Sequence, residues 1–113
     1  EASAAAEYKR SGSPVVSLET LNFSYRIVVS GDAPRWTPTQ VFDDGRRTFI
    51  RFPKAMLVRE APGLFVEREG QTQLVNYVVK RELYIVPRLL DVAELRVGQE
   101  DQEIVRIERV DGR

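Results

Sequence analysis

Hydrophobic and polar residues alternate along much of the chain from residue 15 onward, which is the pattern of half-buried β-strands. The clearest case is Leu21–Val29, where one predicted face contains Leu21, Phe23, Tyr25, Ile27 and Val29. Turn residues separate such segments at intervals of about 8–12 residues, as is typical of sandwiches and barrels. The pattern predicts an all-β fold, a two-sheet β-sandwich of about seven to nine short, mainly antiparallel strands.

The strongest local signal is a hairpin turn at Asp43–Gly45, between two apolar segments. Glycine adopts positive φ without steric cost, so we predict a three-residue loop with Gly45 in the left-handed region. The buried face of this hairpin then contains Phe42, Thr48, Ile50 and Phe52, and the outer face carries Arg47, Phe49 and Arg51 beside Val41. A two-residue turn at Asp44-Gly45 would instead place Val41 inside in place of Phe42.

Three later segments complete the predicted sheets. Leu74–Val79 is apolar on both faces apart from Asn76, which indicates a central strand. Leu89–Leu95 fits either one helical turn or a strand, and residues 104–107 alternate as a final strand. Two more turns are expected, one at Glu69-Gly70 and one at Gly98–Gln102.

The first 14 residues are rich in Ala, Ser, Gly and charge and end in Ser-Gly-Ser-Pro. We therefore expect a flexible linker remnant over 1–14 and a β-sandwich domain over 15–113. The start of the chain has no basic-then-apolar signal sequence, and no apolar segment reaches the roughly 20 residues of a spanning helix. A weak strand at Val15–Glu19 makes that sheet edge a candidate docking edge, with contact residues Val15, Val16 and Leu18.

Composition excludes several classes of function. The chain has 113 residues, the size of one domain, with a formal net charge of zero and neither histidine nor cysteine. It therefore lacks the commonest general base, the commonest metal ligands and any thiol nucleophile. The zero net charge argues against a strongly basic nucleic-acid binder. We predict that the chain is not an enzyme and uses no cofactor or metal.

The adjacent carboxylates Asp43 and Asp44 are better explained as turn formers than as a site. A glycosidase pair must face one substrate across about 5–9 Å, whereas neighbouring side chains in a turn diverge. The alternating oxygen ligands of a calcium loop are also missing around these residues.

Contact with a partner is the more plausible role for the aromatic and cationic residues. Phe49 with Arg46, Arg47 and Arg51 fits a protein interface or single-stranded nucleic acid, or else a solvated strand face. Trp36 is either an anchor in a partner interface or a plug at one end of the sandwich. An alternative hypothesis is a carbohydrate- or ligand-binding module, in which Trp36, Tyr25 and Tyr84 form an exposed stacking platform.

Several short motifs, in order, resemble the TrbG/CagX family of conjugal transfer proteins. They are Val41–Gly45, Thr48–Ile50, Phe52-Pro53, Val75–Tyr77, Tyr84–Val86, Arg88-Leu89 and Ala93–Arg96. The resemblance extends over about Tyr25–Arg109. Three positions depart from the family pattern: Pro87 and Leu90, and Lys80-Arg81 where a glycine-bearing hairpin is usual. These departures concern local turns.

The resemblance implies the C-terminal domain of the ninth VirB-type component of type IV secretion and conjugation systems. Such a domain is a structural scaffold of the outer-membrane core complex in the periplasm, and no catalytic residue is carried over. Its implied partners are a small outer-membrane lipoprotein, a larger channel-forming core subunit and further copies of itself in a ring. Membrane contact is then indirect, and no direct contact with nucleic acid is expected.

Overall fold

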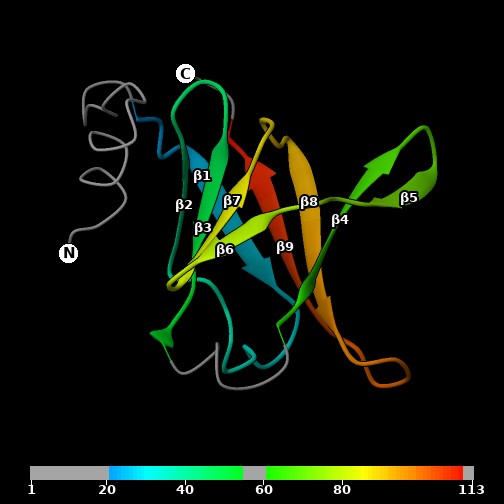
Figure 1. Cartoon of the computed structure of the whole chain (residues 1–113). Coiled ribbons are helices and arrows are strands. Elements are labelled where there is room, and N and C mark those ends of the chain that lie inside the picture. The colour runs from blue at the N-terminus through cyan, green and yellow to red at the C-terminus, as the bar shows by residue number, and fades with distance from the viewer. Residues whose placement is uncertain (1–20, 55–60, 111–113) are drawn as a thin grey trace.

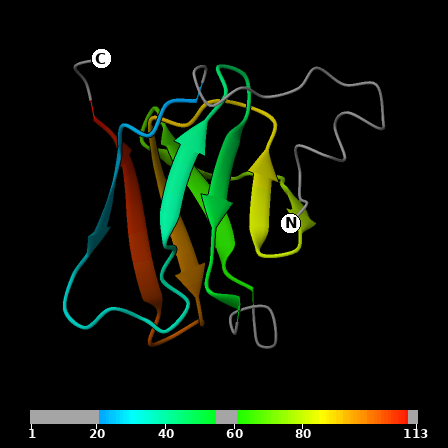
Figure 2. The same cartoon turned by 90° about the vertical axis from the view of Figure 1, so that its left-hand side faces the viewer.

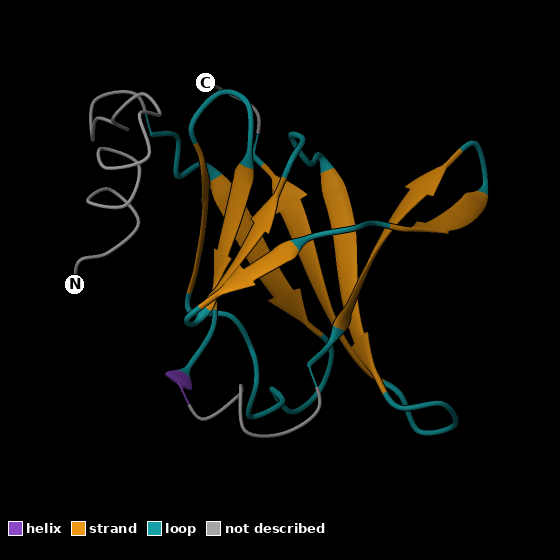
Figure 3. Cartoon of the chain, in the orientation of Figure 1, coloured by secondary structure: helices purple, strands orange, loops and turns teal. Residues whose placement is uncertain are grey.

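The structure is a computed structural model that describes residues 21–54 and 61–110. Nine strands in these residues form two antiparallel sheets that pack face to face (Figures 1 and 3). The strands are β1 (Tyr25–Val29), β2 (Gln40–Asp43), β3 (Thr48–Arg51), β4 (Gly63–Arg68), β5 (Gln71–Leu74), β6 (Val78–Lys80), β7 (Leu83–Val86), β8 (Val92–Val97) and β9 (Glu103–Arg109). The predicted all-β, two-sheet architecture is confirmed. The predicted boundary between residues 14 and 15 lies outside the described residues and stays a prediction.

The larger sheet has the strand order β1-β9-β8-β4-β5 and the smaller has β2-β3-β7-β6. Figure 2 shows β2, β3 and β7 side by side, with β9 and β8 in the layer behind them. Alternate residues of both sheets point into the core between them. Its fully buried side chains include Tyr84, Phe52, Ile50, Leu64, Leu95 and Ile107.

The strand at Leu21–Val29 begins later than its alternation suggests. Tyr25, Ile27 and Val29 pack against the core as predicted, but Phe23 is 46% exposed. The cause is Asn22, whose backbone N–H and C=O both pair with Asp43 of β2. This bridge holds the chain before Tyr25 against the smaller sheet, so the prediction that Phe23 shares the buried face is wrong.

The hairpin between β2 and β3 exists, but its predicted three-residue loop is wrong. Asp43 pairs with Thr48 and Phe42 with Phe49, which leaves a four-residue loop over 44–47. Directly paired residues of an antiparallel ladder lie on the same face. Phe42 therefore lies outside with Phe49, whereas Val41 is buried, as a two-residue turn would also have placed it. The other expected inner residues, Thr48, Ile50 and Phe52, are buried, and Gly45 has the predicted positive φ, 92°.

The apolar segment at Leu74–Val79 is not a central strand. It leaves the larger sheet at β5 and enters the smaller one at β6, and it forms the edge strand of each. Leu74, Val78 and Val79 are 67%, 61% and 48% exposed, and only Val75 between them is buried in the core. Two edge strands and the short segment that joins them therefore have the same run of apolar residues as one buried central strand.

The predictions for the later strands and turns agree with the structure. The segment that fitted either a helical turn or a strand overlaps β8, and the final alternating segment lies within β9. The turns at Glu69-Gly70 and Gly98–Gln102 connect β4 to β5 and β8 to β9. Arg81, at the turn where the family usually has glycine, has a positive φ of 58°.

Candidate interaction surfaces

Asp43 is a buried joint between the two sheets, with 2% of its surface exposed. Its carboxylate accepts hydrogen bonds from the Tyr25 hydroxyl at 2.5 Å, the Asn22 amide at 3.1 Å and the Gly45 backbone N–H at 2.8 Å. The Arg109 guanidinium lies 3.9 Å away. Burial, and then the Asp43 carboxylate, raise the pKa of Tyr25 well above its usual value. The expected turn residue thus also ties β1 and β9 to β2.

Asp44 organises the hairpin loop. Its carboxylate accepts the backbone N–H groups of Arg46 at 2.9 Å and Arg47 at 2.8 Å, and it pairs with the Arg47 guanidinium at 2.9 Å. Burial alone would raise the pKa of Asp44, but these hydrogen bonds more than offset it and hold the pKa below its usual value. Both carboxylates are therefore occupied by structural contacts of the fold.

An apolar row crosses the outer face of the smaller sheet, and we call it the outer stripe. It consists of Phe23, Phe42, Phe49, Ile85 and Val78. The last four are paired across β2, β3, β7 and β6, and Phe23 lies beside Phe42 with their ring centroids 5.3 Å apart. Phe42 stacks on Phe49 at 5.0 Å. The two ends of the stripe are the most exposed, Phe23 at 46% and Val78 at 61%.

Cationic side chains border the outer stripe. The Arg47 guanidinium lies over the Phe49 ring, 5.4 Å from its centroid, and Phe49 is only 3% exposed. Arg51, in the adjacent row of β3, pairs with Glu82 at 3.4 Å. Lys80, in the same row at the β6 edge, is exposed. The structure thus brings Arg47, Phe49 and Arg51 to one face, and their role in partner contact stays a prediction.

Sequence reasoning missed the other members of this surface. Phe23, Ile85 and Val78 come from three segments that are far apart in the chain, and only strand pairing aligns them with Phe49. No local pattern carries that information. The family motifs containing Phe49 and Ile85 were the nearest available signal.

Trp36 lies in the loop between β1 and β2 and belongs to the core cluster, with 7% of its surface exposed. Its indole Nε1–H donates a 2.7 Å hydrogen bond to the Glu103 carboxylate of β9. This is the position that the plug interpretation describes. The predicted contact between Trp36 and a partner is not tested by this position and stays a prediction.

The stacking platform required by the carbohydrate hypothesis is not formed. Tyr84 is completely buried, and its hydroxyl donates a 2.7 Å hydrogen bond to the Pro62 carbonyl. Burial, and then the neighbouring Tyr77 hydroxyl, raise the pKa of Tyr84 far above its usual value. With Trp36 also buried, these side chains offer no common exposed face for a sugar ring.

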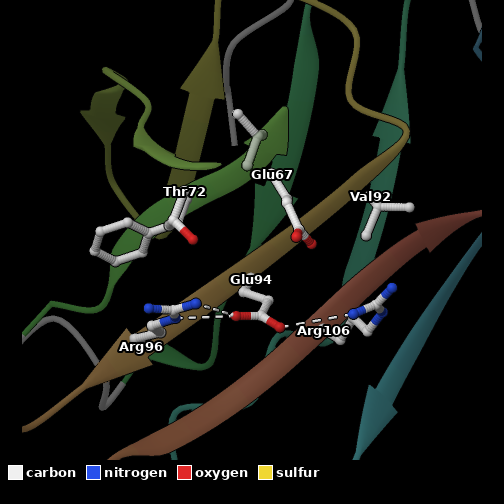
Figure 4. Close-up of a pocket in the computed structure, with 8 residues that line it drawn as sticks. Glu67, Thr72, Val92, Glu94, Arg96 and Arg106 are labelled. Carbon is white, nitrogen blue, oxygen red and sulfur yellow. Dashed lines mark hydrogen bonds and ion pairs between the residues drawn. The ribbon is translucent and has the colours of Figure 1, made fainter. Parts of the chain in front are cut away.

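A cavity of about 180 Å³ opens on the outer face of the larger sheet (Figure 4). Glu94 lies at its floor, paired with Arg96 at 2.6 Å and with Arg106 at 3.6 Å. Glu67 and Thr72 line the same cavity from β4 and β5. The charge of Glu94 is neutralised by these two arginines, and within residues 21–54 and 61–110 no group of three or more acidic residues could hold a metal ion.

Two further findings concern the chain ends and the membrane. The predicted docking residues Val15, Val16 and Leu18 lie outside the described residues, so that prediction is not tested. In the part of the chain that the structure describes, no helix has the length and apolar character needed to cross a bilayer.

Comparison with known proteins gives the family. Residues 1–110 match the CagX family model, described as conjugal transfer protein. The chain is also 41% identical over 95 residues to a "Probable conjugal transfer protein TrbG" of Sinorhizobium fredii (strain NBRC 101917 / NGR234). That alignment covers 82% of this chain and 34% of the relative, so the chain spans about a third of the relative's length. The chain belongs to the TrbG/CagX family of conjugal transfer proteins, which are components of conjugation and secretion systems in the cell envelope.

Proposed function

We propose that this chain is a contact module of a conjugal transfer apparatus and acts as a scaffold in its outer-membrane core complex on the periplasmic side. In this role it docks a small outer-membrane lipoprotein and the larger channel-forming subunit, and it is repeated around a ring. Family membership supports the apparatus. The docking role is supported by one structural observation, the outer stripe with its cationic border.

The outer stripe has the chemistry of a protein interface. Interface cores are enriched in aromatic side chains and arginine and depleted in other charges, which describes three adjacent phenylalanine rings beside Arg47 and Arg51. Phe23 and Val78 remain exposed at its two ends, where a partner would cover them. We assign this surface to the channel-forming subunit.

We assign the lipoprotein to the N-terminal docking edge of Val15, Val16 and Leu18, where an extended peptide would add by backbone pairing. The experiment is a titration of the mature lipoprotein peptide from the same transfer system into ¹⁵N-labelled protein. A contiguous set of edge-strand amides should shift. Spectra that stay unchanged at high peptide concentration would rule out this docking role.

A variant of the outer stripe tests whether the two partners bind separate surfaces. Phe23→Ser should leave lipoprotein binding unchanged and weaken binding of the purified channel-forming subunit. Loss of both interactions in a folded Phe23→Ser protein would contradict the assignment of two separate surfaces.

A further inference from the structure

One sheet edge lacks the protection that the other edges have. Among the described residues the two sheets end in four edge strands: β1, β5, β2 and β6. β1 carries Arg26, β2 carries the inward-pointing Asp43 and β6 carries Lys80. Charges of this kind discourage pairing with a strand that brings no opposite charge. β5, with the sequence Gln-Thr-Gln-Leu, has neither a charge nor a proline.

β5 is also presented away from the body of the domain. The β4–β5 hairpin extends beyond the rest of the larger sheet (Figure 1), and all four residues of β5 are exposed. Leu74 is 67% exposed on the outer face and is paired with Phe65 of β4. An uncharged strand with an exposed leucine and unpaired backbone groups is a template for an added strand.

The outer face beside β5 has one carboxylate without a counter-charge. Glu67 is paired with Thr72 across the β4–β5 ladder and points into the cavity of Figure 4. Glu94 and Glu108, the other acids of this face, have arginine partners within 4 Å, whereas Glu67 has none among residues 21–54 and 61–110. A strand added at β5 with a cationic side chain on this face would give Glu67 the counter-charge that it lacks.

The opposite edge of the same sheet offers a matching strand. On β1 the outward residues are Arg26, with 61% of its side chain exposed, and Val28, at 36%. Arg26 is held by a single 3.4 Å ion pair with Glu108. Four antiparallel pairings separate β1 from β5, so the two strands run in the same direction.

One row of paired residues across the larger sheet sets the register in which two copies would pair. It runs from Val28 through Arg106, Glu94 and Phe65 to Leu74. A second copy placed beside the first in the plane of the sheet brings its Val28 next to Leu74. Its Arg26 then lies next to Thr72, within reach of Glu67.

We propose that β5 takes the β1 edge of a second copy of this chain in parallel register, so that the larger sheet continues from one copy to the next. The contact joins Leu74 to Val28 of the second copy, and Glu67 to its Arg26. Antiparallel pairing of β5 with another β5 would place Leu74 against the second copy's Leu74 or Thr72, and it would leave both copies of Glu67 without a cation. Because the two surfaces differ, the contact is head-to-tail and repeats from copy to copy, as the ring of the proposed function requires. The inference rests on the proposed function, in which the domain is a repeated scaffold.

These 113 residues contain no cysteine, so the chain contributes no cross-link of its own before cysteines are introduced. Leu74→Cys and Val28→Cys are introduced together into the chain in a donor cell that carries the complete transfer system, and the membranes are mildly oxidised. Strands paired side by side bring Cα atoms within disulfide range, so dimers and a ladder of higher species should form. Each single cysteine should give no ladder, and a dimer from Leu74→Cys alone would show β5–β5 pairing and overturn the proposal.

A charge reversal provides the matched control. Arg26→Glu added to the cysteine pair should reduce the cross-linked fraction several-fold, and Arg26→Glu with Glu67→Arg should restore it. If neither change alters the cross-linked fraction, the proposed register is wrong. Donors that transfer DNA normally but give no ladder would overturn the edge pairing and leave the proposed function standing. The proposed function itself fails if deleting the gene leaves transfer unchanged.

Discussion

The Tyr25 hydroxyl donates a 2.5 Å hydrogen bond to the buried Asp43 carboxylate, and this contact joins the first strand of the larger sheet to the first strand of the smaller one. Asn22 and Gly45 donate to the same carboxylate. Edge strands β1 and β2 are therefore held together by a polar joint at this end of the sandwich. The stability of the fold depends on a residue that the sequence marks only as part of a turn.

Asp43→Ala should destabilise the fold by about 3 kcal/mol, because it leaves several donors in a buried site without an acceptor. Urea unfolding monitored by circular dichroism measures this loss. The exposed Asp32→Ala is the control and should change the free energy of unfolding by less than about 0.5 kcal/mol. Equal effects of the two substitutions would contradict the role of Asp43 as a joint.

Asp44→Asn tests the hairpin loop through its pH dependence. The pKa of Asp44 is lowered in the folded chain, so its ionised form contributes stability at neutral pH that is lost as the pH falls through the lowered pKa. Wild type should exceed the variant by about 1 kcal/mol at pH 7, and the difference should shrink between about pH 5 and the acid limit. A difference that stays constant or grows on acidification would contradict the argument.

Arg81→Gly should stabilise the β6–β7 turn by about 0.5 to 1 kcal/mol, because φ at this position is 58° and glycine avoids the left-handed strain of a side chain. Thermal unfolding of the two proteins checks the sign. Glu100→Gly is the matched control in another exposed turn without positive φ, and it should lower stability by a few tenths of a kcal/mol. A destabilised Arg81→Gly protein would mean that the arginine side chain makes a larger contribution than its backbone strain costs.

The Trp36 indole and the Glu103 carboxylate should be energetically coupled, because a 2.7 Å hydrogen bond to a charged acceptor links them. A double-mutant cycle with Trp36→Phe and Glu103→Gln measures this coupling, expected at about 1 to 2 kcal/mol. Additive effects of the two substitutions would show that the indole is held by packing alone.

The sequence predicted the strands whose residues alternate along one face. β9 is the clearest example, because Val105 and Ile107 are buried while Arg106 between them contacts solvent. The family motifs also led to the correct family. These features are local, so a linear pattern is sufficient to identify them.

Features that depend on strand pairing could not be predicted in the same way. Apolar content alone does not distinguish one buried strand from two edge strands joined at Val75, so Leu74–Val79 was misassigned. The hairpin register depends on Asp43 reaching Tyr25 and Arg109, both distant in sequence. The outer stripe depends on three further strand pairings.

The central claim, that the chain acts in conjugal transfer through surface contact, is tested most directly by plasmid transfer frequency. The donor cells lack the native gene and carry the chain, in its full-length protein, with Phe23→Ser and Val78→Ser at the two ends of the outer stripe. Both side chains are exposed, so the fold should survive, and loss of an interface contact should lower transfer about tenfold or more. The matched control, Val92→Ser with Ile104→Ser on the outer face of the other sheet, should transfer within about twofold of wild type. Unchanged transfer in the stripe variant, or an equal loss in the control, would contradict the account.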